Sequence, residues 1–201
     1  LARVNVLCVD KTGTITRPDM SVSDVVFLKD NVGKLIAGVA GNMDDDNETM
    51  KAIKNYYHIT GRDNSAERVY SFSSQNKYSG AVLDGRCYIF GAPEYVLLDT
   101  YAEYEDIFER YSGHGERILV FGECVGDPCG NIIEEAVNPY AFIILENEIR
   151  DTAKETFGYF ASQGVDIVVI SGDNPVTASK VAVRAGINNA ENYIDATTLK
   201  S

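Results

Sequence analysis

The feature that most constrains this chain is a single aspartate placed directly after a short apolar run. Residues 6–9, VLCV, have the composition of a buried strand, and Asp10 follows them at the strand's carboxyl end. In open parallel sheets this is the end where ligands bind. Lys11, Thr12 and Thr14 supply ammonium and hydroxyl donors that suit phosphate oxygens, and Gly13 allows close backbone approach. The pattern predicts a phosphate-handling loop at the edge of a parallel sheet.

Asp10 also has neighbours that suit covalent phosphoryl transfer. A carboxylate that attacks a phosphoryl group forms an acyl phosphate, and the ammonium of Lys11 offsets the charge that accumulates. For an isolated Asp-Lys-Thr, a turn-capping aspartate would be the better interpretation. The full stretch DKTGT, residues 10–14, resembles the phosphorylation signature of the P-type ATPases, membrane pumps with a haloacid-dehalogenase-like catalytic domain. The resemblance implies Mg²⁺ as a cofactor, with Asp10 and Thr12 at the metal.

Composition limits the partners of the chain. With 201 residues and 45% apolar content, it can build one large or two small domains. The net charge of −12 argues against nucleic acid and anionic membrane surfaces as partners. No apolar run reaches the roughly 18 residues of a spanning helix, so we expect a soluble piece. The cysteines at 8, 87, 124 and 129 form no C-x-x-C pair, and we expect buried, reduced thiols in the cytosol.

The middle of the chain reads as a separate α+β domain. Arg17-Pro18-Asp19 interrupts the first pattern and predicts a boundary, after which residues 22–28 are extended. Helical spacing predicts a helix over residues 47–57 with Asn47 as its N-cap. Residues 81–90 predict a hairpin around an Asp84-Gly85 turn. Strands near 118–124 and 140–146 would complete a mostly antiparallel sheet.

The last part of the chain, from residue 147, again shows the pattern of alternating helices and strands that is typical of βαβ units. A helix is predicted from Arg150 through Ser162, a strand over residues 165–170, and a helix from Pro175 towards Ala185. The predicted fold class is therefore α/β, a haloacid-dehalogenase-like doubly wound parallel sheet, incomplete at its C-terminus. Residues 1–17 and 147–201 would form this phosphorylation domain. Residues 18–146 would form an inserted nucleotide-binding domain on an antiparallel sheet.

Several motifs of the middle domain also resemble the P-type ATPases. Phe72 to Lys77 is similar to the stretch whose aromatic ring stacks on adenine and whose lysine approaches the nucleotide, and an aromatic face with a nearby ammonium suits a purine nucleotide. Gly91 opens a Gly-Ala-Pro-Glu box in which Phe90 takes the place of the family's lysine. Glu48 resembles the acidic residue near the adenine amino group, and Arg117 the arginine that reaches the phosphates. A helix-capping Glu48 and a solvated Arg117 are equally compatible with the sequence.

The C-terminal motifs follow the same resemblance. Ser171-Gly172-Asp173 stands where the family has Thr-Gly-Asp, and implies that Ser171 and Gly172 hold a phosphoryl oxygen while Asp173 helps to bind ATP or magnesium. Arg150 resembles the arginine of the family's hinge segment and is assigned to the nucleotide site. The family carries an aspartate three residues earlier, where this chain has Asn147, so we expect a weaker charge contribution there.

The resemblance implies the catalytic part of a cation-transporting P-type ATPase. Its partners would be ATP, the transported cation, and the actuator and transmembrane domains of the same polypeptide, and it would be the cytosolic portion of a membrane protein. The absence of a His-Pro pair favours calcium- or magnesium-type pumps over copper or zinc pumps, by analogy. A soluble phosphatase of the same superfamily is the alternative, but Thr12 occupies the position of its second acid. A nucleotide-binding module without turnover is the third interpretation.

One expectation concerns motifs that the sequence does not show. The family carries a Gly-Asp-Gly-x-Asn-Asp box and a preceding lysine after the Ser171 region, and neither occurs before Ser201. The box supplies a carboxylate for magnesium, an ion held by few protein ligands. We therefore expect these 201 residues to bind nucleotide but to show little steady-state ATPase activity and weak magnesium binding at Asp10.

Overall fold

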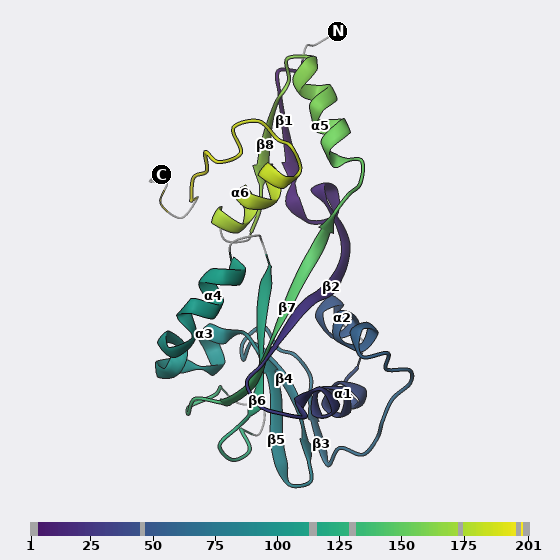
Figure 1. The fold of residues 1–201 in the computed structure, drawn as a ribbon, viewed down its shortest axis with the longest axis vertical. Coiled ribbons are helices and arrows are strands. Elements are labelled where there is room, and N and C mark those ends of the chain that lie inside the picture. The colour runs from purple at the N-terminus through teal and green to yellow at the C-terminus, as the bar shows by residue number, and fades with distance from the viewer. Residues whose placement is uncertain are drawn as a thin grey trace. The chain divides into compact units, whose positions relative to one another are not determined.

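The computed structural model describes residues 4–44, 47–112, 116–128, 132–172, 175–195 and 198. The chain forms two compact units (Figure 1). Unit 1 comprises Leu1–Asp19, Tyr111–Glu116 and Asn147–Ser201, and unit 2 comprises Met20–Arg110 and Arg117–Glu146. The boundaries expected from the sequence, after residue 17 and before residue 147, lie close to these divisions. The segment Tyr111–Glu116 belongs to unit 1, which no sequence pattern indicated.

Unit 1 is built on two parallel strands. Its elements are β1 (Val6–Asp10), the turn Lys11–Ile15, α5 (Ala153–Ser162), β8 (Asp166–Ile170) and α6 (Pro175–Arg184). The two strands pair in register from Val6 with Asp166 to Asp10 with Ile170. Parallel strands need a crossover connection, usually with a helix, which is the signature of an α/β fold. The predicted α/β class is confirmed, and so are the predicted helices and strand of the C-terminal segment.

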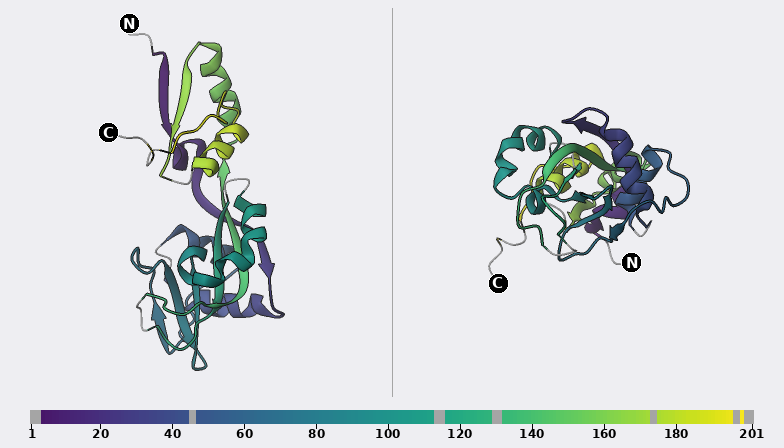
Figure 2. Two further views of the ribbon diagram at one scale, coloured as in Figure 1. Left: turned by 90° about the vertical axis from the view of Figure 1, so that its left-hand side faces the viewer. Right: turned by 90° about the horizontal axis from the view of Figure 1, so that it is seen from below.

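The prediction that residues 6–9 form a buried strand is correct for the strand and for one of its faces only. Helices α5 and α6 lie on one side of the β1–β8 pair (Figure 2). On the other side Val6, Val168 and Ile170 are 52%, 46% and 60% exposed, and Cys8 is exposed too. An apolar run shows that a strand can be buried on both faces, but not that the chain provides a layer for each face.

The core of unit 1 lies between the strand pair and its two helices. Val9, Ile167 and Val169 pack against a buried cluster from the turn, the helices and the segment after α6: Ile15, Ala153, Phe157, Val181, Ala182, Ala185 and Ile187. Ile15 is fully buried, so it anchors the turn that follows Asp10 in the core.

Unit 2 is organised around a six-stranded sheet in the order β2-β7-β6-β5-β4-β3. The strands are β2 (Thr16–Phe27), β3 (Arg68–Tyr70), β4 (Tyr78–Leu83), β5 (Arg86–Gly91), β6 (Arg117–Glu123) and β7 (Asn138–Ile149). The helices are α1 (Val32–Asn42), α2 (Glu48–Tyr56), α3 (Pro93–Val96) and α4 (Glu105–Ser112), with a 3-10 turn over Leu98–Tyr104. The pairs from β3 to β7 are antiparallel, as the sequence predicted.

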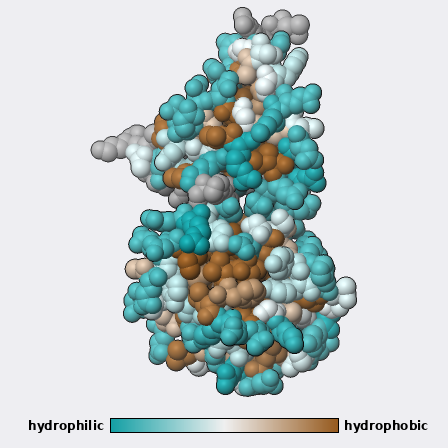
Figure 3. Space-filling model, viewed as in Figure 1, coloured by the Kyte–Doolittle hydropathy of each residue, from teal (hydrophilic) through white to brown (hydrophobic). Residues whose placement is uncertain are grey.

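Helices cover both faces of this sheet. On one face α1 and α2 pack through Ile36, Val39 and Ile53 against Phe90 and Phe121 of the strands. On the other face, Tyr104 and Phe108 stack edge to face on Phe142 of β7. The visible surface is mostly polar in both units, and apolar side chains gather in the middle of the unit 2 surface (Figure 3). None of the helices in the described ranges is long and apolar enough to cross a membrane.

Two local predictions for unit 2 are confirmed, and one element was missed. Asn47 caps α2, because its side-chain oxygen accepts a hydrogen bond from the Met50 amide at 2.9 Å. Asp84 and Gly85 have φ angles of 50° and 70°, as a two-residue hairpin turn requires. Helix α1 was missed. Three glycines within Val32–Asn42 lower its helix propensity, and burial of its apolar face outweighs that cost.

Arg17-Pro18-Asp19 lies at the division between the units, but the prediction that it interrupts the extended chain is wrong. Strand β2 runs through Pro18 without interruption. Proline lacks the N–H that a central strand needs for its ladder, but β2 is an edge strand, where proline is tolerated. The chain therefore passes from unit 1 to unit 2 along a strand and not through a loop.

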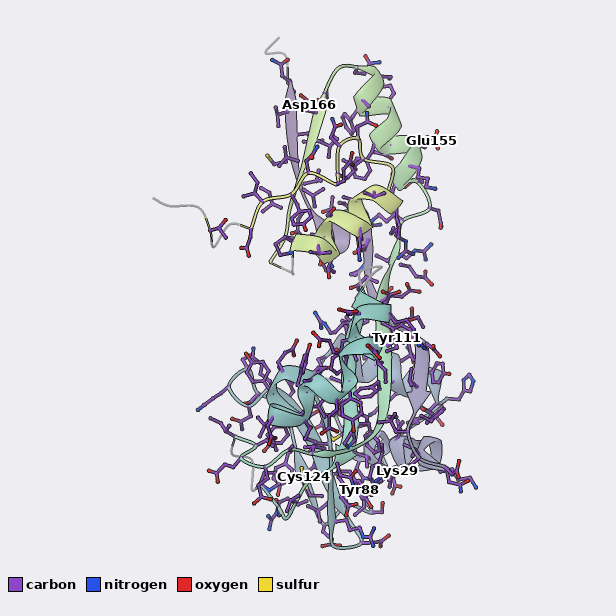
Figure 4. All side chains as sticks on the ribbon, turned by 60° about the vertical axis from the view of Figure 1, so that its left-hand side comes forward. Lys29, Tyr88, Tyr111, Cys124, Glu155 and Asp166 are labelled. Carbon is purple, nitrogen blue, oxygen red and sulfur yellow. The ribbon has the colours of Figure 1, made fainter. Side chains whose placement is uncertain are left out.

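The described cysteines, Cys8, Cys87 and Cys124, are all free, and Cys129 lies outside the described residues. Cys87 and Cys124 are buried as predicted, whereas the prediction for Cys8 is wrong because it lies on the uncovered face of β1. The Cys124 amide donates to the Cys87 carbonyl at 2.9 Å. Figure 4 labels Cys124 in unit 2. A hydrogen bond between the two thiols lowers the pKa of Cys87 and raises the pKa of Cys124.

The close packing of the hairpin generates a stability prediction. A Cβ on Gly80 would lie 2.3 Å from the Tyr88 carbonyl oxygen of the adjacent strand, so Gly80→Ala must push two backbones apart. We expect it to lower the free energy of unfolding by about 1 to 3 kcal/mol in urea titrations followed by circular dichroism. Gly38→Ala in α1 is the control, since its Cβ would meet only Leu83 at 3.9 Å. Equal stability of the two variants would contradict the observed strand spacing.

Candidate functional site

Asp10 occupies the position that its sequence context predicted. It ends β1 with an exposed side chain, and its register partner is Ile170, the last residue of β8. Ser171 and Gly172 follow Ile170 directly, so they lie at the same edge of the strand pair as Asp10. Asp166 marks the start of β8, at the opposite end of the pair (Figure 4). The structure therefore brings together the Asp10 and Ser171 motifs, which lie near opposite ends of the sequence.

The turn after Asp10 is shaped by its glycine. Gly13 has a φ of 80°, a left-handed conformation that favours glycine, and no atom lies within 4 Å of the position of a Cβ. Lys11 is only 5% exposed, whereas Thr12 is exposed. The Thr16 hydroxyl donates to the Lys11 carbonyl at 3.4 Å and helps to close the turn. The space beside Gly13 allows a ligand to approach the backbone.

The C-terminal segment clamps this turn through Arg150. Its guanidinium Nη2 donates to the Gly13 carbonyl at 2.6 Å, and its backbone amide donates to the Ile15 carbonyl at 3.0 Å. The sequence resemblance assigned Arg150 to the nucleotide site; the structure shows its contact with the turn, and a role in nucleotide binding stays a prediction. No pattern within the sequence could reveal this bond, because its partners are 137 residues apart.

Asn147 has a definite role in unit 1. Its side-chain Nδ2 donates to the carbonyl oxygens of Pro18 and Asp19 at 3.4 and 3.1 Å. An aspartate at this position has no proton to donate at neutral pH and would face two carbonyl oxygens. The departure from the family pattern thus comes with a different interaction, a hydrogen-bonded amide in place of a charge.

Metal binding in unit 1 can be considered from its donor set. Among the residues that the structure describes, no group of three or more His, Cys, Asp or Glu could hold a metal ion. Mg²⁺ is usually held by one or two carboxylates together with phosphate oxygens and water. The exposed Asp10 carboxylate and the oxygens of Thr12 are hard donors that fit this chemistry. Asp173 lies outside the described residues, so its predicted role stays a prediction.

Unit 2 has a small, partly open hollow beside Phe72. Phe72 is 48% exposed, so its ring is accessible to a ligand. The hollow is lined by residues from the end of α1, the start of α2, the segment after β3, and β4: Met43, Asp44, Asn47, Met50, Ser71, Phe72 and Ser79. Met43 and Met50 are almost fully buried, so the surface that a ligand can reach comes mainly from the Phe72 ring and the exposed Asp44 and Ser71. An exposed aromatic ring beside polar groups suits stacking of a flat heterocycle.

The strand register gathers further predicted residues near Phe72. Tyr78 pairs with Gly91, and Gly91 pairs with Val120. Lys77 directly precedes Tyr78, and Arg117 lies three residues before Val120. Both therefore lie at the end of the sheet where β5 finishes at Gly91. Phe72 follows β3 towards this same end, because Tyr70 pairs with Gly80. One end of the sheet thus carries four of the predicted residues, Phe72, Lys77, Gly91 and Arg117.

Lys77 and Gly91 have clear local roles. Lys77 adopts a φ of 59°, its amide donates to the Ser73 carbonyl at 2.9 Å, and its ammonium lies 6.0 Å from the centre of the Tyr95 ring. A Cβ on Gly91 would lie 2.3 Å from Cγ1 of Val96, so this position needs glycine for packing. A direct role for either residue in nucleotide binding stays a prediction.

Phe90 and Glu48 differ in how they relate to the hollow. Phe90 is 2% exposed and its ring centre lies 4.9 Å from that of Phe121, so it is a core residue. Glu48 begins α2 next to Asn47, and its carboxylate pairs with the Lys51 ammonium at 2.7 Å. The carboxylate that lines the hollow belongs instead to Asp44, which the sequence analysis did not single out. The Arg62 guanidinium holds Asp44 at 2.6 Å.

The other lining residues were also missed, and for a physical reason. Met43, Ser71 and Ser79 come from three separate elements and carry no motif of their own. Met50 fitted the apolar face of its helix and gave no reason to expect a binding surface. The aromatic residue of the Phe72 motif was the one sequence signal that pointed to this hollow.

Comparison with known proteins agrees with this architecture. Residues 4–200 match the family described as haloacid dehalogenase-like hydrolase. The chain is 37% identical over 190 residues to a calcium-transporting ATPase, CtpE, of Mycolicibacterium smegmatis, covering 94% of this chain and 24% of that protein. It is 34% identical over 203 residues to a probable cation-transporting ATPase of Streptococcus pneumoniae, covering 97% and 25%. The chain thus spans about a quarter of the length of these relatives.

Solved structures show the same fold. A zinc-transporting PIB-type ATPase aligns with a TM-score of 0.64 and 18% identity, over 92% of this chain and 28% of that one. The catalytic CPx-ATPase domain CopB-B aligns with a TM-score of 0.58 and 15% identity, over 92% and 59%.

The parallel β1–β8 pair, with an aspartate at the carboxyl end of β1 and helices on one side, defines an α/β unit, joined here to an α+β unit. The chain belongs to the haloacid dehalogenase-like hydrolases. Within them it is homologous to the catalytic region of the cation-transporting P-type ATPases, as the sequence resemblance predicted.

The contacts of Asn147 generate a prediction for unit 1. Asn147→Ala should lower the free energy of unfolding by about 0.5 to 1.5 kcal/mol through loss of its hydrogen bonds, and Asn147→Asp should lower it further through repulsion by two carbonyl oxygens. The additional loss in Asn147→Asp should disappear as pH falls below about 4, because a protonated carboxyl can donate. Thermal unfolding between pH 3 and 7 measures this. A pH-independent difference between the variants would contradict the contact.

Proposed function

We propose that this chain binds ATP in unit 2 and transfers its γ-phosphate to Asp10 in unit 1, as the catalytic portion of a cation-transporting P-type ATPase. The observation that carries the proposal is the exposed Asp10 carboxylate at the carboxyl end of β1. It opens a glycine-containing turn that Arg150 holds in place. Membership of the haloacid dehalogenase-like hydrolases supports a nucleophilic role for this aspartate.

In this proposal each residue of unit 1 has a defined part. The Asp10 carboxylate attacks the γ-phosphorus, and an acyl phosphate forms as ADP leaves. The Lys11 ammonium, one residue away, offsets the charge on the transferring group. Ser171 and Gly172 hold a phosphoryl oxygen through the hydroxyl and the N–H, and Asp173 adds a carboxylate. Asp10 and Thr12 would hold Mg²⁺, which neutralises phosphate charge when bound.

In unit 2 the hollow would take the adenine ring. Stacking on the exposed Phe72 ring supplies the main attraction. Lys77 and Arg117 supply positive charge at the same end of the sheet, which a triphosphate needs in a chain of net charge −12. Glu48 at the start of α2 and Gly91 at the end of β5 complete the proposed nucleotide site.

The wider role of the chain follows from its relatives. We propose that it is the cytosolic portion of a membrane pump and acts with actuator and transmembrane domains that carry the transported cation. A relative at 37% identity is a calcium-transporting ATPase, which favours a calcium-type over a heavy-metal pump. Acyl phosphate hydrolysis, coupled to cation movement, would complete the cycle. Soluble phosphatases of the superfamily carry a second acid two residues after the nucleophile, and this chain has Thr12 there. The lack of this general acid argues against rapid phosphatase turnover.

Adenine stacking can be tested on the 201-residue chain. Phe72→Ala should weaken ATP binding by about 1 to 3 kcal/mol in isothermal titration, because the exposed ring is lost. Tyr56→Ala is the matched control, since that ring is 46% exposed but lies at the far end of α2 from Asn47. Unchanged ATP affinity in Phe72→Ala would move the nucleotide site elsewhere.

The nucleophile can be tested by acyl-phosphate labelling of the pump that contains this chain. With γ-labelled ATP, Asp10→Asn should abolish acid-stable, hydroxylamine-labile labelling, because an amide cannot form the acyl phosphate. ATP affinity should be retained. Asp166→Asn is the control, an exposed carboxylate at the other end of the strand pair, and it should label normally. Labelling of Asp10→Asn at the control level would rule out Asp10 as the nucleophile.

A further inference from the structure

Lys54 is a charged side chain in the core of unit 2. It lies on α2, one helical turn after Met50, and is 7% exposed, whereas its neighbour Lys51 has a side chain that is 48% exposed. Its ammonium Nζ donates to the Met43 carbonyl at 2.7 Å. Burial of an ammonium is costly unless it is hydrogen-bonded and electrostatically favoured. A lysine in this place therefore needs a structural reason beyond packing.

The partner of Lys54 supplies part of that reason. Met43 is the C-cap residue of α1, and its amide donates to the Ala40 carbonyl at 3.1 Å. The carboxyl end of a helix carries a partial negative charge, which favours a cation there. The Lys54 ammonium therefore bonds the end of α1 to the middle of α2. The backbone carbonyl of Lys54 accepts from the Ile59 amide at 2.9 Å, which holds the end of α2 as well.

This bond joins the two walls of the hollow beside Phe72. Met43 and Asp44 line it from the end of α1, and Asn47 and Met50 line it from the start of α2. Lys54 does not line the hollow itself. Its ammonium bonds to one wall, and its own helix forms the other, so this side chain adds a directional contact to the apolar packing of the two helices.

We propose that Lys54 is a positioning residue for the base of the bound nucleotide: it fixes the end of α1 to the middle of α2, and so fixes the shape of the hollow that Met43 and Met50 line beside the Phe72 ring. This inference rests on the proposed nucleotide site. The lysine acts through the Met43 carbonyl and makes no contact with the ligand. Its removal should therefore weaken binding of the base and leave the attraction for phosphates unchanged.

The test uses the 201-residue chain and isothermal titration with ATP, AMP and inorganic tripolyphosphate. Lys54→Met keeps the length of the stem and removes the ammonium, while Lys54→Arg keeps a cationic donor. Lys34→Met is the matched control, since Lys34 is an exposed lysine of α1 outside the hollow and its loss changes the net charge equally.

We expect Lys54→Met to weaken ATP and AMP by the same factor, about tenfold, and Lys54→Arg to recover most of this affinity. Tripolyphosphate binding should be equal in wild type and Lys54→Met, and Lys34→Met should change ATP and AMP affinities by less than twofold. Unchanged ATP affinity in Lys54→Met would overturn the inference. Loss of tripolyphosphate binding together with ATP would also overturn it, because the effect would then be one of charge. No ATP binding by the wild type would instead refute the proposed function.

A measurement on the wild type covers the case in which Lys54→Met does not fold. Hydrogen exchange of the Lys54 ammonium and of the Met43 and Met50 amides is followed by nuclear magnetic resonance with and without saturating AMP. Exchange should slow at all three residues when AMP binds, because the ligand closes the hollow against both walls. Exchange that is unchanged at these residues, while Phe72 resonances shift, would overturn the inference.

Discussion

The parallel pairing of β1 with β8 is the interaction on which unit 1 depends. These strands come from opposite ends of the chain, and their register sets Asp10 beside Ile170 and hence beside the Ser171 motif. Parallel partners need a crossover, and here α5 precedes β8 while α6 follows it, both packed on the same side. The edge carrying Asp10 is thereby left open to solvent, as a nucleophile that must meet a phosphate requires.

Hydrogen bonds from the returning chain complete this arrangement. Arg150 binds the turn after Asp10 at the Gly13 and Ile15 carbonyls, and Asn147 binds the carbonyls of Pro18 and Asp19. Both donors use backbone acceptors, so their effect depends on chain geometry more than on the identity of the residues they bind. The substitution of an amide for an acid at position 147 is consistent with this, because only a donor can serve there.

In unit 2 the candidate site is positioned by antiparallel strand register and by the packing of two helices. The antiparallel register brings Lys77, Gly91 and Arg117 to one end of the sheet, while α1 and α2 meet above β4 to leave the hollow beside Phe72. A buried lysine joins those two helices at the hollow. The hydrogen bond from Lys54 to the Met43 carbonyl fixes the relative position of the two helix ends. Apolar packing alone would define that position less well, because it is non-directional.

The sequence by itself determined the α/β class, the family, the Asp10 turn, the Asp84-Gly85 hairpin and the cap at Asn47. Each of these depends on chemistry within a few consecutive residues, such as a required φ angle or a side-chain acceptor next to free amides. Only the tertiary structure decided the uncovered face of β1, the passage of β2 through Pro18, helix α1 with its three glycines, and the contacts of Arg150 and Lys54. These features depend on which layer covers a strand and on which carbonyl accepts from a donor. Both are set by packing between segments that are distant in the sequence, so no local sequence pattern predicts them.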